Sequence, residues 1–311
     1  MTIVIFGGNG FVGRNVANVF RQHHLNFVTA SRSDKQVDLR NPLQTADFLT
    51  AHQPDVIVNC AAHVGSLHYV TEQAADVIMD NSRMILGMYE AIAKACPKAT
   101  VINPIANCAY PDTANTFVED KWWDGHLHRS VLSYGATKRL LWATAESFSM
   151  QHDIRSIHLL VSNMYGPYDS ADPNKAHALN ALVSKFVKAL HEGKEELMIW
   201  GTGIAIREWL YAEDFGRIVY QIICNPNMPG LAEPTNIAQN FGLSVKELSN
   251  LIQAQASKPI RIRWDPDKPD GMPKKVMDDR KFRKVFPNFE FTSLEHGIME
   301  TFAYYESIYP F

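Results

Sequence analysis

The sequence predicts an α/β protein with a Rossmann-type, doubly wound parallel sheet and a smaller C-terminal α/β substrate lobe. Short apolar runs alternate with helical patterns through the first half of the chain, and a glycine-rich turn follows the first run. After Asn163, loops rich in Pro, Gly and Asp separate shorter elements. We therefore expect a dinucleotide-binding domain over residues 1–162 with a return segment at about 205–240, and a substrate lobe over 163–311.

Hydrophobic periodicity justifies the elements of the first half in order. Apolar runs of strand length occur at residues 2–6, 26–30, 55–62, 99–103 and 156–161. Helical patterns lie between them, from about residue 11, over 42–52, up to about 95, and over about 133–151. Strands that alternate with helices in this way form a parallel sheet with helices on both faces.

Composition and charge exclude several functional classes. The net charge of −3 does not favour a nucleic-acid partner, and no apolar run reaches the ~20 residues of a membrane span. The start, MTIVIF, lacks the positive region of a signal peptide, so we expect a cytoplasmic protein. Four cysteines without a C-x-x-C pair, and histidines without metal-ligand spacing, predict no bound metal.

The segment GGNGFVG at residues 7–13 is the strongest local motif, because it follows the first strand and opens a helix. Its glycines let the backbone approach a pyrophosphate, whose charge meets the free N–H groups of the helix N-terminus. A tight strand-to-helix turn without a ligand is the alternative. The residues that we expect to bind a dinucleotide here are Gly7, Gly10, Phe11, Val12 and Gly13.

The end of the second strand distinguishes NAD from NADP. An acidic residue there binds the ribose 2′-hydroxyl, whereas an arginine accepts a 2′-phosphate. Ser31 and Arg32 stand at this position, and no carboxylate precedes Asp34. We therefore predict NADP(H) as the cofactor, although Arg32 as an exposed loop residue is the alternative. Asp38 and Leu39, which come next, suit contacts near the adenine.

Tyr134 and Lys138, in SYGATK, are four residues apart and share a helix face. A free phenol titrates near 10, but a nearby ammonium and a nicotinamide cation stabilise the phenolate and lower its pKa. Such a tyrosine protonates a carbonyl oxygen as hydride arrives, or removes the proton in reverse. The pair lies downstream of a dinucleotide turn and the strand ATVIN, and this context predicts a catalytic role.

Seven segments carry a family resemblance through nearly the whole chain: GGNGFVG, NCAAHVG, NCAYP, SYGATK, SNMYGPYD, WGTGIAIREWLYAEDF and DKPDGMPKKVMD. The chain resembles the extended short-chain dehydrogenase/reductases, and among them the GDP-L-fucose synthases, which are GDP-4-keto-6-deoxy-mannose 3,5-epimerase-4-reductases. The last two segments are specific to that group. The resemblance adds Ala61 and Ala62 to the expected cofactor contacts. It implies Tyr134 as the proton donor and Lys138 as its helper and ribose anchor.

The resemblance also implies Cys108 and His177 as the acid/base pair that moves protons at sugar carbons C3 and C5. A carbon next to a C4 ketone is acidified by enolate formation, and epimerisation needs one group to remove the proton and another to return one on the opposite face. A thiol and an imidazole suit this task when their surroundings tune them. A core thiol at Cys108 and an ordinary residue before a helix at His177 are the alternatives.

Ala106 stands where the family places its catalytic serine, whose hydroxyl binds the C4 oxygen. Loss of one donor to a developing oxyanion costs about 10²–10³ in rate. We therefore expect C3/C5 proton exchange with impaired C4 reduction, unless Asn107 supplies an N–H donor instead. Two alternatives stay open: an epimerase in which NADP is structural, and a non-catalytic protein that binds a sugar nucleotide.

Polar and aromatic residues of the second half are expected to bind a GDP-linked sugar. Arg207 has a planar fork that suits a diphosphate, Trp200 can stack on the base, and Asp270 can accept hydrogen bonds from guanine. Asn163 is expected where cofactor and substrate meet. The complete set is Asn163, Lys185, Trp200, Arg207, Asp270 and Lys275.

Some features of the chain stay undecided. The segment 122–125, WWDG, either packs over the sugar or anchors a loop, and neither the sugar (6-deoxy-hexose or heptose) nor the base is determined. The resemblance implies a homodimer through the helices at about 70–95 and 133–151.

Overall fold

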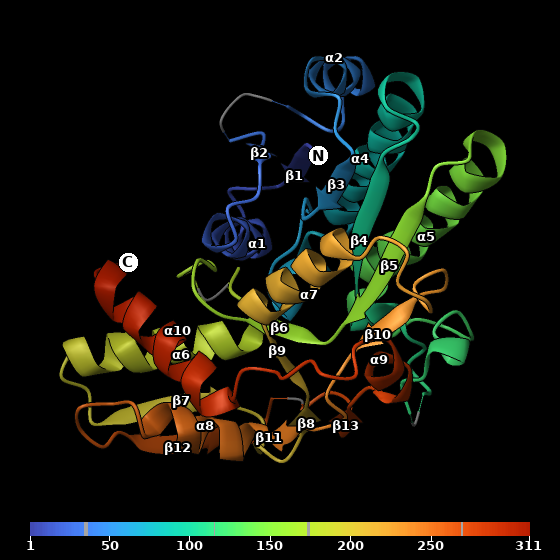
Figure 1. The fold of residues 1–311 in the computed structure, drawn as a ribbon. Helices are drawn as coiled ribbons and strands as arrows, with labels where there is room; N and C mark the ends of the chain where they lie inside the picture. The colour runs from blue at the N-terminus through green and yellow to red at the C-terminus, as the bar shows by residue number, and fades with distance from the viewer. Residues whose placement is uncertain (34–36, 115, 173–174, 269) are drawn as a thin grey trace.

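A six-stranded parallel sheet forms the centre of the described chain, in the order β10-β5-β4-β3-β1-β2 (Figure 1). The computed structural model describes all residues except 34–36, 115, 173–174 and 269, so Asp34 lies outside the described residues. The strands are β1 (Ile3–Phe6), β2 (Phe27–Ala30), β3 (Val56–Asn59), β4 (Thr100–Ala106), β5 (Ser156–Val161) and β10 (Thr235–Ile237). Their order and direction confirm the expected doubly wound fold.

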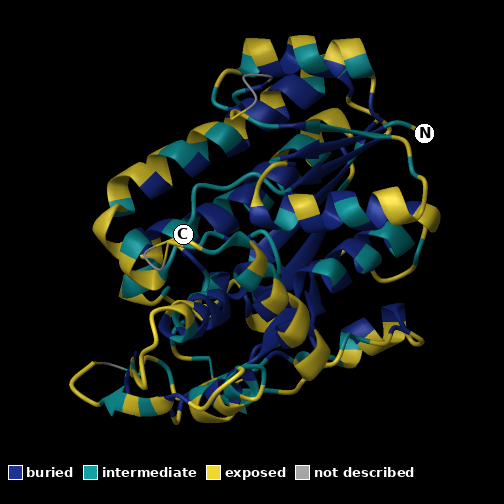
Figure 2. Cartoon of the chain, turned by 90° about the vertical axis from the view of Figure 1, so that its left-hand side faces the viewer, coloured by how far each residue is buried: buried dark blue, intermediate teal, exposed yellow. Residues whose placement is uncertain are grey.

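Helices cover both faces of this sheet. One layer contains α1 (Phe11–Gln22) and α7 (Ala212–Cys224), and the other contains α2 (Pro42–His52), α4 (Ala74–Ala95) and α5 (Leu132–His152). Successive side chains of a strand point to opposite faces. Ile3 and Ile5 therefore pack on the side of α1 and α7, while Val4 and Phe6 pack on the side of α2, α4 and α5. Figure 2 shows the strands as a buried centre between helices with exposed outer faces.

Two expected elements need correction. The strand expected over 55–62 ends at Asn59, because Cys60 N–H makes the last bond to the neighbouring strand, at Phe6 O (2.9 Å), and the chain then leaves the sheet. The helix expected over about 70–95 is two helices, α3 (Leu67–Glu72) and α4, which meet at Gln73. A six-residue helix that buries only Val70 has little periodicity to reveal it.

The C-terminal half adds a second body below the carboxyl ends of the main strands in Figure 1. Its core lies between α6 (Ala178–His191), α8 (Val245–Gln253), α10 (Leu294–Ile308) and the pair β7 (Glu196–Trp200) and β12 (Arg261–Asp265). Further strands are β6 (Asn163–Tyr165), β8 (Ile206–Arg207), β9 (Trp209–Tyr211), β11 (Leu243–Ser244) and β13 (Lys274–Lys275). The remaining elements are α9 (Arg280–Val285) and the short helices η1 (Asn107–Ala109), η2 (Glu119–Lys121) and η3 (Arg129–Val131).

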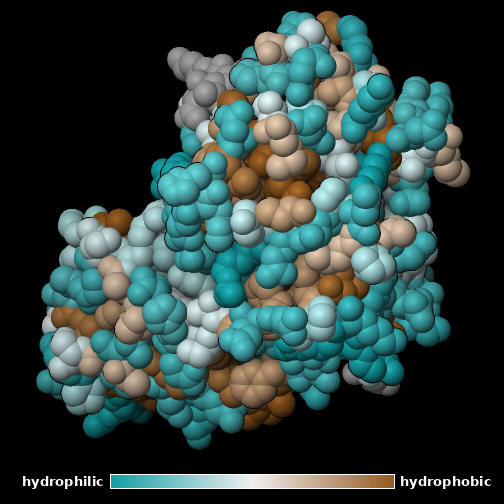
Figure 3. Space-filling model, in the orientation of Figure 1, coloured by the Kyte–Doolittle hydropathy of each residue, from teal (hydrophilic) through white to brown (hydrophobic). Residues whose placement is uncertain are grey.

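Two elements of the late chain belong to the first half of the molecule. Strand β10 pairs with β5 at the sheet edge, and α7 packs on α1. The exact division at residue 162, with a return at about 205–240, stays a prediction. Figure 3 shows hydrophobic residues over β1 and β2 amid a mixed surface. Among the described residues, no helix is long and apolar enough to cross a bilayer.

Candidate active site

The glycine turn leaves the N-terminus of α1 open. Gly7 has φ +73° and donates its N–H to Ala30 O at 2.8 Å, and Gly10 donates to Gly7 O at 2.9 Å. The N-cap residue of α1 is Gly10, which has no side chain to bond the first N–H groups of the helix, so these groups can face an anion. A Cβ on Gly7 would lie 2.7 Å from Ala61 N, and a Cβ on Gly13 would overlap the Gly7 carbonyl. The turn therefore needs these glycines for close packing, and it places Ala61 beside it.

The residues expected at the adenosine end have different surroundings. Arg32 is exposed and Ser31 shares a hydrogen bond with Ser33 at 2.9 Å between the hydroxyl oxygens. The Asp38 carboxylate is held by Arg40, which donates to both of its oxygens at 2.7–3.2 Å. These hydrogen bonds hold the pKa of Asp38 below its usual value. Asp38 is therefore a fixed anion, and its role near the adenine stays a prediction.

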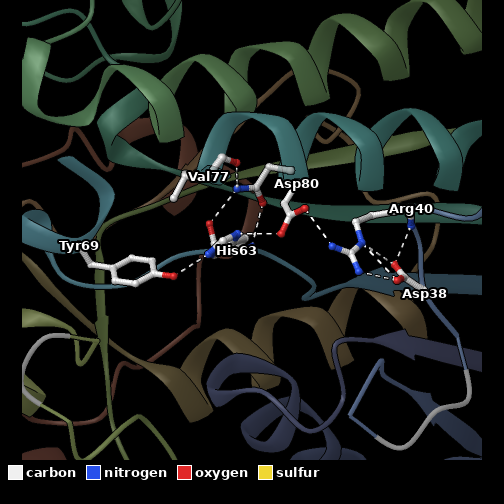
Figure 4. Close-up of polar contacts among 7 residues, drawn as sticks. Asp38, Arg40, His63, Tyr69, Val77 and Asp80 are labelled. Carbon is white, nitrogen blue, oxygen red and sulfur yellow. Dashed lines mark hydrogen bonds and ion pairs between the residues drawn. The ribbon is translucent and has the colours of Figure 1, made fainter. Parts of the chain in front are cut away.

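Arg40 begins a polar network along α4 (Figure 4). The Arg40 Nη1 donates to Asp80 Oδ1 at 3.0 Å, and Asp80 Oδ2 lies 3.0 Å from His63 Nδ1. The other ring nitrogen, His63 Nε2, lies 2.7 Å from the Tyr69 hydroxyl. The Asn81 side chain fixes the His63 backbone by accepting from its N–H (2.9 Å) and donating to its carbonyl (2.8 Å). The network thus joins the loop after β2 to the loop after β3.

Tyr134 and Lys138 lie together in the first turns of α5. The Lys138 ammonium donates to Pro104 O at 3.2 Å and lies 5.3 Å from the centre of the Tyr134 ring. Burial lowers the pKa of Lys138 to about 8. Burial raises the pKa of Tyr134 above its usual value, and the neighbouring Cys108 adds to this rise. The effect of a bound nicotinamide on this phenol stays a prediction.

Cys108 lies between the cofactor residues and the second lobe. Its carbonyl packs against Gly135 of α5, where a Cβ would be only 2.6 Å away. Burial raises the pKa of the thiol to about 11, and the charges of Lys275 and Lys138 oppose this rise. Cys108 is therefore close enough to both lysines to feel their charges, and it is a thiol at neutral pH.

His177 lies at the N-terminus of α6, against the dinucleotide turn. Its ring is 5.4 Å from the Phe11 ring, centre to centre, and its Nδ1 lies 3.1 Å from Asp169 Oδ2. The same carboxylate accepts the His177 backbone N–H at 2.8 Å. In the part of the chain that is described, no hydrogen bond joins Cys108 to His177; the partner of the His177 ring is Asp169. Their action as a pair stays a prediction.

The edge near Ala106 holds polar atoms without partners. Ala106 is in register with Val161 on β5, and Asn107 and Ser162 directly follow the ends of these two strands. Both are buried, and neither Asn107 Nδ2 nor Ser162 Oγ has a hydrogen-bond partner among the described residues. Ser162 is not among the site residues predicted from the sequence, although it is the first residue of the segment SNMYGPYD.

The expected substrate residues form two groups. In the first, Lys275 of β13 lies in register with Arg207 of β8, and Arg207 donates to Asp270 O at 3.0 Å. The Asp270 carboxylate accepts from Thr202, at 2.7 Å from N–H and 2.6 Å from the hydroxyl. Asp270 therefore holds this turn, and its contact with guanine stays a prediction. Buried Glu208 supports the group by accepting from the Met277 N–H at 2.7 Å.

The second group surrounds the exposed ring of Trp200. The ammonium groups of Lys185 and Lys268 lie 5.8 and 5.4 Å from the ring centre. Burial lowers the pKa of Lys185. Lys268 was not selected from the sequence, although it lies in the DPDKPD loop. Asn163 donates to Glu208 O at 3.1 Å and so joins β6 to the strand segment that carries Arg207.

Comparison with known proteins gives the family and the fold. A model of the NAD dependent epimerase/dehydratase family matches residues 3–238. The chain is 27% identical to GDP-L-colitose synthase of Yersinia pseudotuberculosis over 307 residues, and this alignment covers 98% of each protein.

Solved structures of similar proteins share the fold. A GDP-L-fucose synthetase from Naegleria fowleri bound to NADP has a TM-score of 0.85 and 21% identity, covering 99% of this chain and 94% of that one. A GDP-6-OMe-4-keto-L-xylo-heptose reductase from C. jejuni has a TM-score of 0.87 and 21% identity, covering 98% and 97%. The expected Rossmann-type fold is therefore confirmed.

Proposed function

The chain belongs to the NAD-dependent epimerase/dehydratase family, and from this membership we propose that it is an NADP-dependent epimerase/reductase of a GDP-linked 4-keto-6-deoxy sugar. The observation that carries the proposal is the place of Cys108. Its thiol feels the charge of Lys138, beside Tyr134, and of Lys275, which is paired with Arg207. A proton-transferring group thus lies between a hydride-transfer site and a cationic site suited to a diphosphate. The names of the three similar proteins reported above, each for a GDP-sugar enzyme, support the same substrate class.

NADP is the proposed cofactor because the end of β2 offers Arg32 and Ser31 and no carboxylate among the described residues. The NADP-bound state of the Naegleria fowleri structure supports this choice. The open N-terminus of α1 would hold the pyrophosphate, and Lys138 would hold the nicotinamide ribose. When bound, the cofactor supplies the hydride for the C4 ketone.

The acid and base of epimerisation follow from the surroundings of the two residues. Asp169 faces His177 Nδ1, which favours the tautomer that donates to the carboxylate and leaves Nε2 as a proton acceptor. Cys108 keeps its proton at neutral pH because burial raises its pKa to about 11. We therefore assign His177 as the base that removes the proton at C3 or C5 and Cys108 as the acid that returns one.

A homodimer is part of the proposal. Helix α4 exposes Ile78, Met79 and Leu86, and α5 packs beside it. Two such helix pairs bury this apolar surface when they pack as a four-helix bundle. Gel filtration with light scattering distinguishes this dimer from a monomer.

Proton NMR of the protein with GDP-4-keto-6-deoxy-mannose in deuterated water, with and without NADPH, tests the proposed activity. We expect deuterium at C3 or C5 without NADPH and slow formation of the C4 alcohol with it. Deuterium uptake without any alcohol would instead support an epimerase in which NADP is structural, a reading that Ala106 favours. Neither deuterium nor alcohol would refute the activity and leave a binding protein. Repeating the experiment with a GDP-4-keto-heptose identifies the preferred sugar.

A further inference from the structure

Arg139 follows Lys138 on α5, and its side chain makes four hydrogen bonds to main-chain carbonyls. Its Nε donates to Ala109 O at 2.9 Å, its Nη1 to Gly125 O at 2.9 Å, and its Nη2 to Asp124 O at 3.0 Å and Trp122 O at 3.2 Å. All four acceptors belong to the segment 109–125. One side chain therefore holds both ends of this segment on the helix that carries Tyr134 and Lys138.

The arginine is kept there against an electrostatic cost. Burial lowers its pKa, and the charge of Asp124 only partly opposes this effect. The acceptors are carbonyl dipoles, and no carboxylate lies within ion-pair distance of Arg139 among the described residues. Its guanidinium lies 5.6 Å from the centre of the Trp123 ring. A planar group with five donors can serve four carbonyls at once, which an ammonium cannot do with the same geometry.

The hydrogen bonds of Arg139 also bear on the role of the segment 122–125, WWDG. Trp122 is buried, and its ring packs edge-on against Trp142 of α5 with centres 5.6 Å apart. The Trp123 ring lies 4.9 Å from the same indole. Arg139 binds the carbonyls of Trp122, Asp124 and Gly125. The segment therefore anchors a loop to α5. This is one of the two roles that the sequence left open, the other being packing over the sugar.

Cys108 directly precedes the segment 109–125 that Arg139 holds. Ala109, whose carbonyl Arg139 binds, directly follows Cys108 in the same short helix η1. One helical turn before Arg139, Gly135 packs against the Cys108 carbonyl. Helix α5 thus holds the cysteine turn at two successive levels, 135 and 139, which lie on the same side of the helix.

We infer that Arg139 is a positioning residue for Cys108: it fixes the thiol relative to Lys138 and Lys275 and so supports proton transfer at C3 and C5. The inference rests on the proposed function for the transfer itself, but the positioning is independent of it. Displacement of a reacting group by about 1 Å costs on the order of 10²-fold in rate. We expect Arg139→Ala to lose about that factor in deuterium exchange while its KM for NADPH stays unchanged.

Chemical rescue separates positioning from general damage. Millimolar guanidinium is expected to restore exchange in Arg139→Ala, because it can occupy the vacated site and donate to the same carbonyls, whereas sodium chloride of equal ionic strength is not. Arg261→Gln, which alters an exposed arginine on β12, is the matched control and should behave as the wild type. Wild-type exchange in Arg139→Ala without guanidinium would overturn the inference. If this variant does not fold, Arg139→Lys takes its place, with the same expected loss and a melting temperature close to that of the wild type.

Alkylation by iodoacetamide tests the positioning without any substrate. Peptide mass spectrometry should show faster modification of Cys108 in Arg139→Ala than in the wild type, with the exposed Cys224 as the internal reference. An unchanged rate at Cys108 would overturn the positioning. Absence of exchange in the wild type would instead refute the proposed function, and the alkylation result would then decide the inference alone.

Discussion

At the residue scale, Ala106 places a methyl group where the resemblance expects a hydroxyl. Asn107, which follows it in η1, and Ser162, which follows its register partner Val161, carry buried polar atoms without partners in the described chain. Such atoms are costly to bury, and a substrate oxygen or a water molecule bound at this edge would satisfy them. Ala106 therefore lies at an edge of the sheet, the carboxyl ends of β4 and β5, that still contains polar groups.

The substitution Ala106→Ser is expected to raise the rate of C4 reduction about 10²-fold, because it adds one donor to the developing oxyanion. Deuterium exchange at C3 and C5 should not fall, since Cys108 and His177 are untouched and the enolate of that step carries its charge on the same C4 oxygen. NADPH absorbance follows reduction, and NMR follows exchange. Ala143→Ser on α5 is the control, and an unaltered reduction rate in Ala106→Ser would contradict the assignment of this position.

Lys138 makes the cofactor-free protein sensitive to alkaline pH. Burial lowers its pKa to about 8, so the ammonium is lost as pH rises through that value. Since kcat/KM reports the groups of the free enzyme, we expect kcat/KM for NADPH to be level below pH 7 and to fall above pH 8. In Lys138→Arg the charge persists to above pH 12, and the fall near pH 8 should disappear although the rate is lower. A wild-type profile that is flat to pH 10 would refute this prediction.

The sequence allowed some of these residues to be placed together and not others. Tyr134 and Lys138 share a helix, so their proximity follows from spacing alone. The approach of Lys275 to Arg207 depends on the pairing of two two-residue strands, which have no periodicity to predict them. Arg139 was missed for a similar reason, because its partners are backbone carbonyls and leave no pattern of residue types.

At the scale of elements, long helices and central strands followed from periodicity, and the connections between them did not. Helix α2 spans the expected residues 42–52 and β5 the expected 156–161. The short helix α3 depends on its Ser66 cap and on tertiary contacts, such as the bond from the Ser133 hydroxyl to Val70 O at 3.1 Å. Contacts of this kind join segments far apart in sequence, and a local pattern cannot contain them.

The network between the loops after β2 and β3 gives the third prediction. Asp80 bridges Arg40 and His63, so Asp80→Asn removes the charge that both partners face. The groups are partly exposed, and we expect an effect of about 1.4 kcal/mol, a tenfold higher KM for NADPH, with kcat little changed. Tyr69→Phe removes only the hydrogen bond between the Tyr69 hydroxyl and His63 Nε2, and it should raise the KM for NADPH by less than Asp80→Asn does.

Initial rates over a range of NADPH concentrations measure this effect. Glu90→Gln, an exposed carboxylate on the same helix, is the matched control. An unchanged KM in Asp80→Asn would show that the two loops hold the cofactor independently of the network.

At the scale of the whole molecule, the stability of the sheet is linked to pH through His158 on β5. This side chain is 1% exposed, and neither ring nitrogen has a hydrogen-bond partner among the described residues. The nearest carboxylate is that of Glu146, 3.9 Å away and half exposed, which is too far for a hydrogen bond. Burial lowers the pKa of His158 to about 4. The imidazole is therefore buried in its neutral form.

Because the unfolded chain binds this proton with a pKa near 6.5, the unfolded state carries more protons than the native state between pH 6.5 and 4. The free energy of unfolding must therefore fall as pH decreases through this window, and by about 3 kcal/mol in total, while above pH 6.5 the residue contributes no pH dependence. In His158→Leu this part of the acid sensitivity should disappear, whereas in His126→Gln, which alters an exposed histidine, it should persist. Urea unfolding followed by tryptophan fluorescence at pH 7.5 and 4.5 measures the difference, and equal acid losses in wild type and His158→Leu would assign the sensitivity to other groups. The expected difference is a substantial part of the stability of a typical domain, so one buried imidazole limits how far into acid this sheet remains folded.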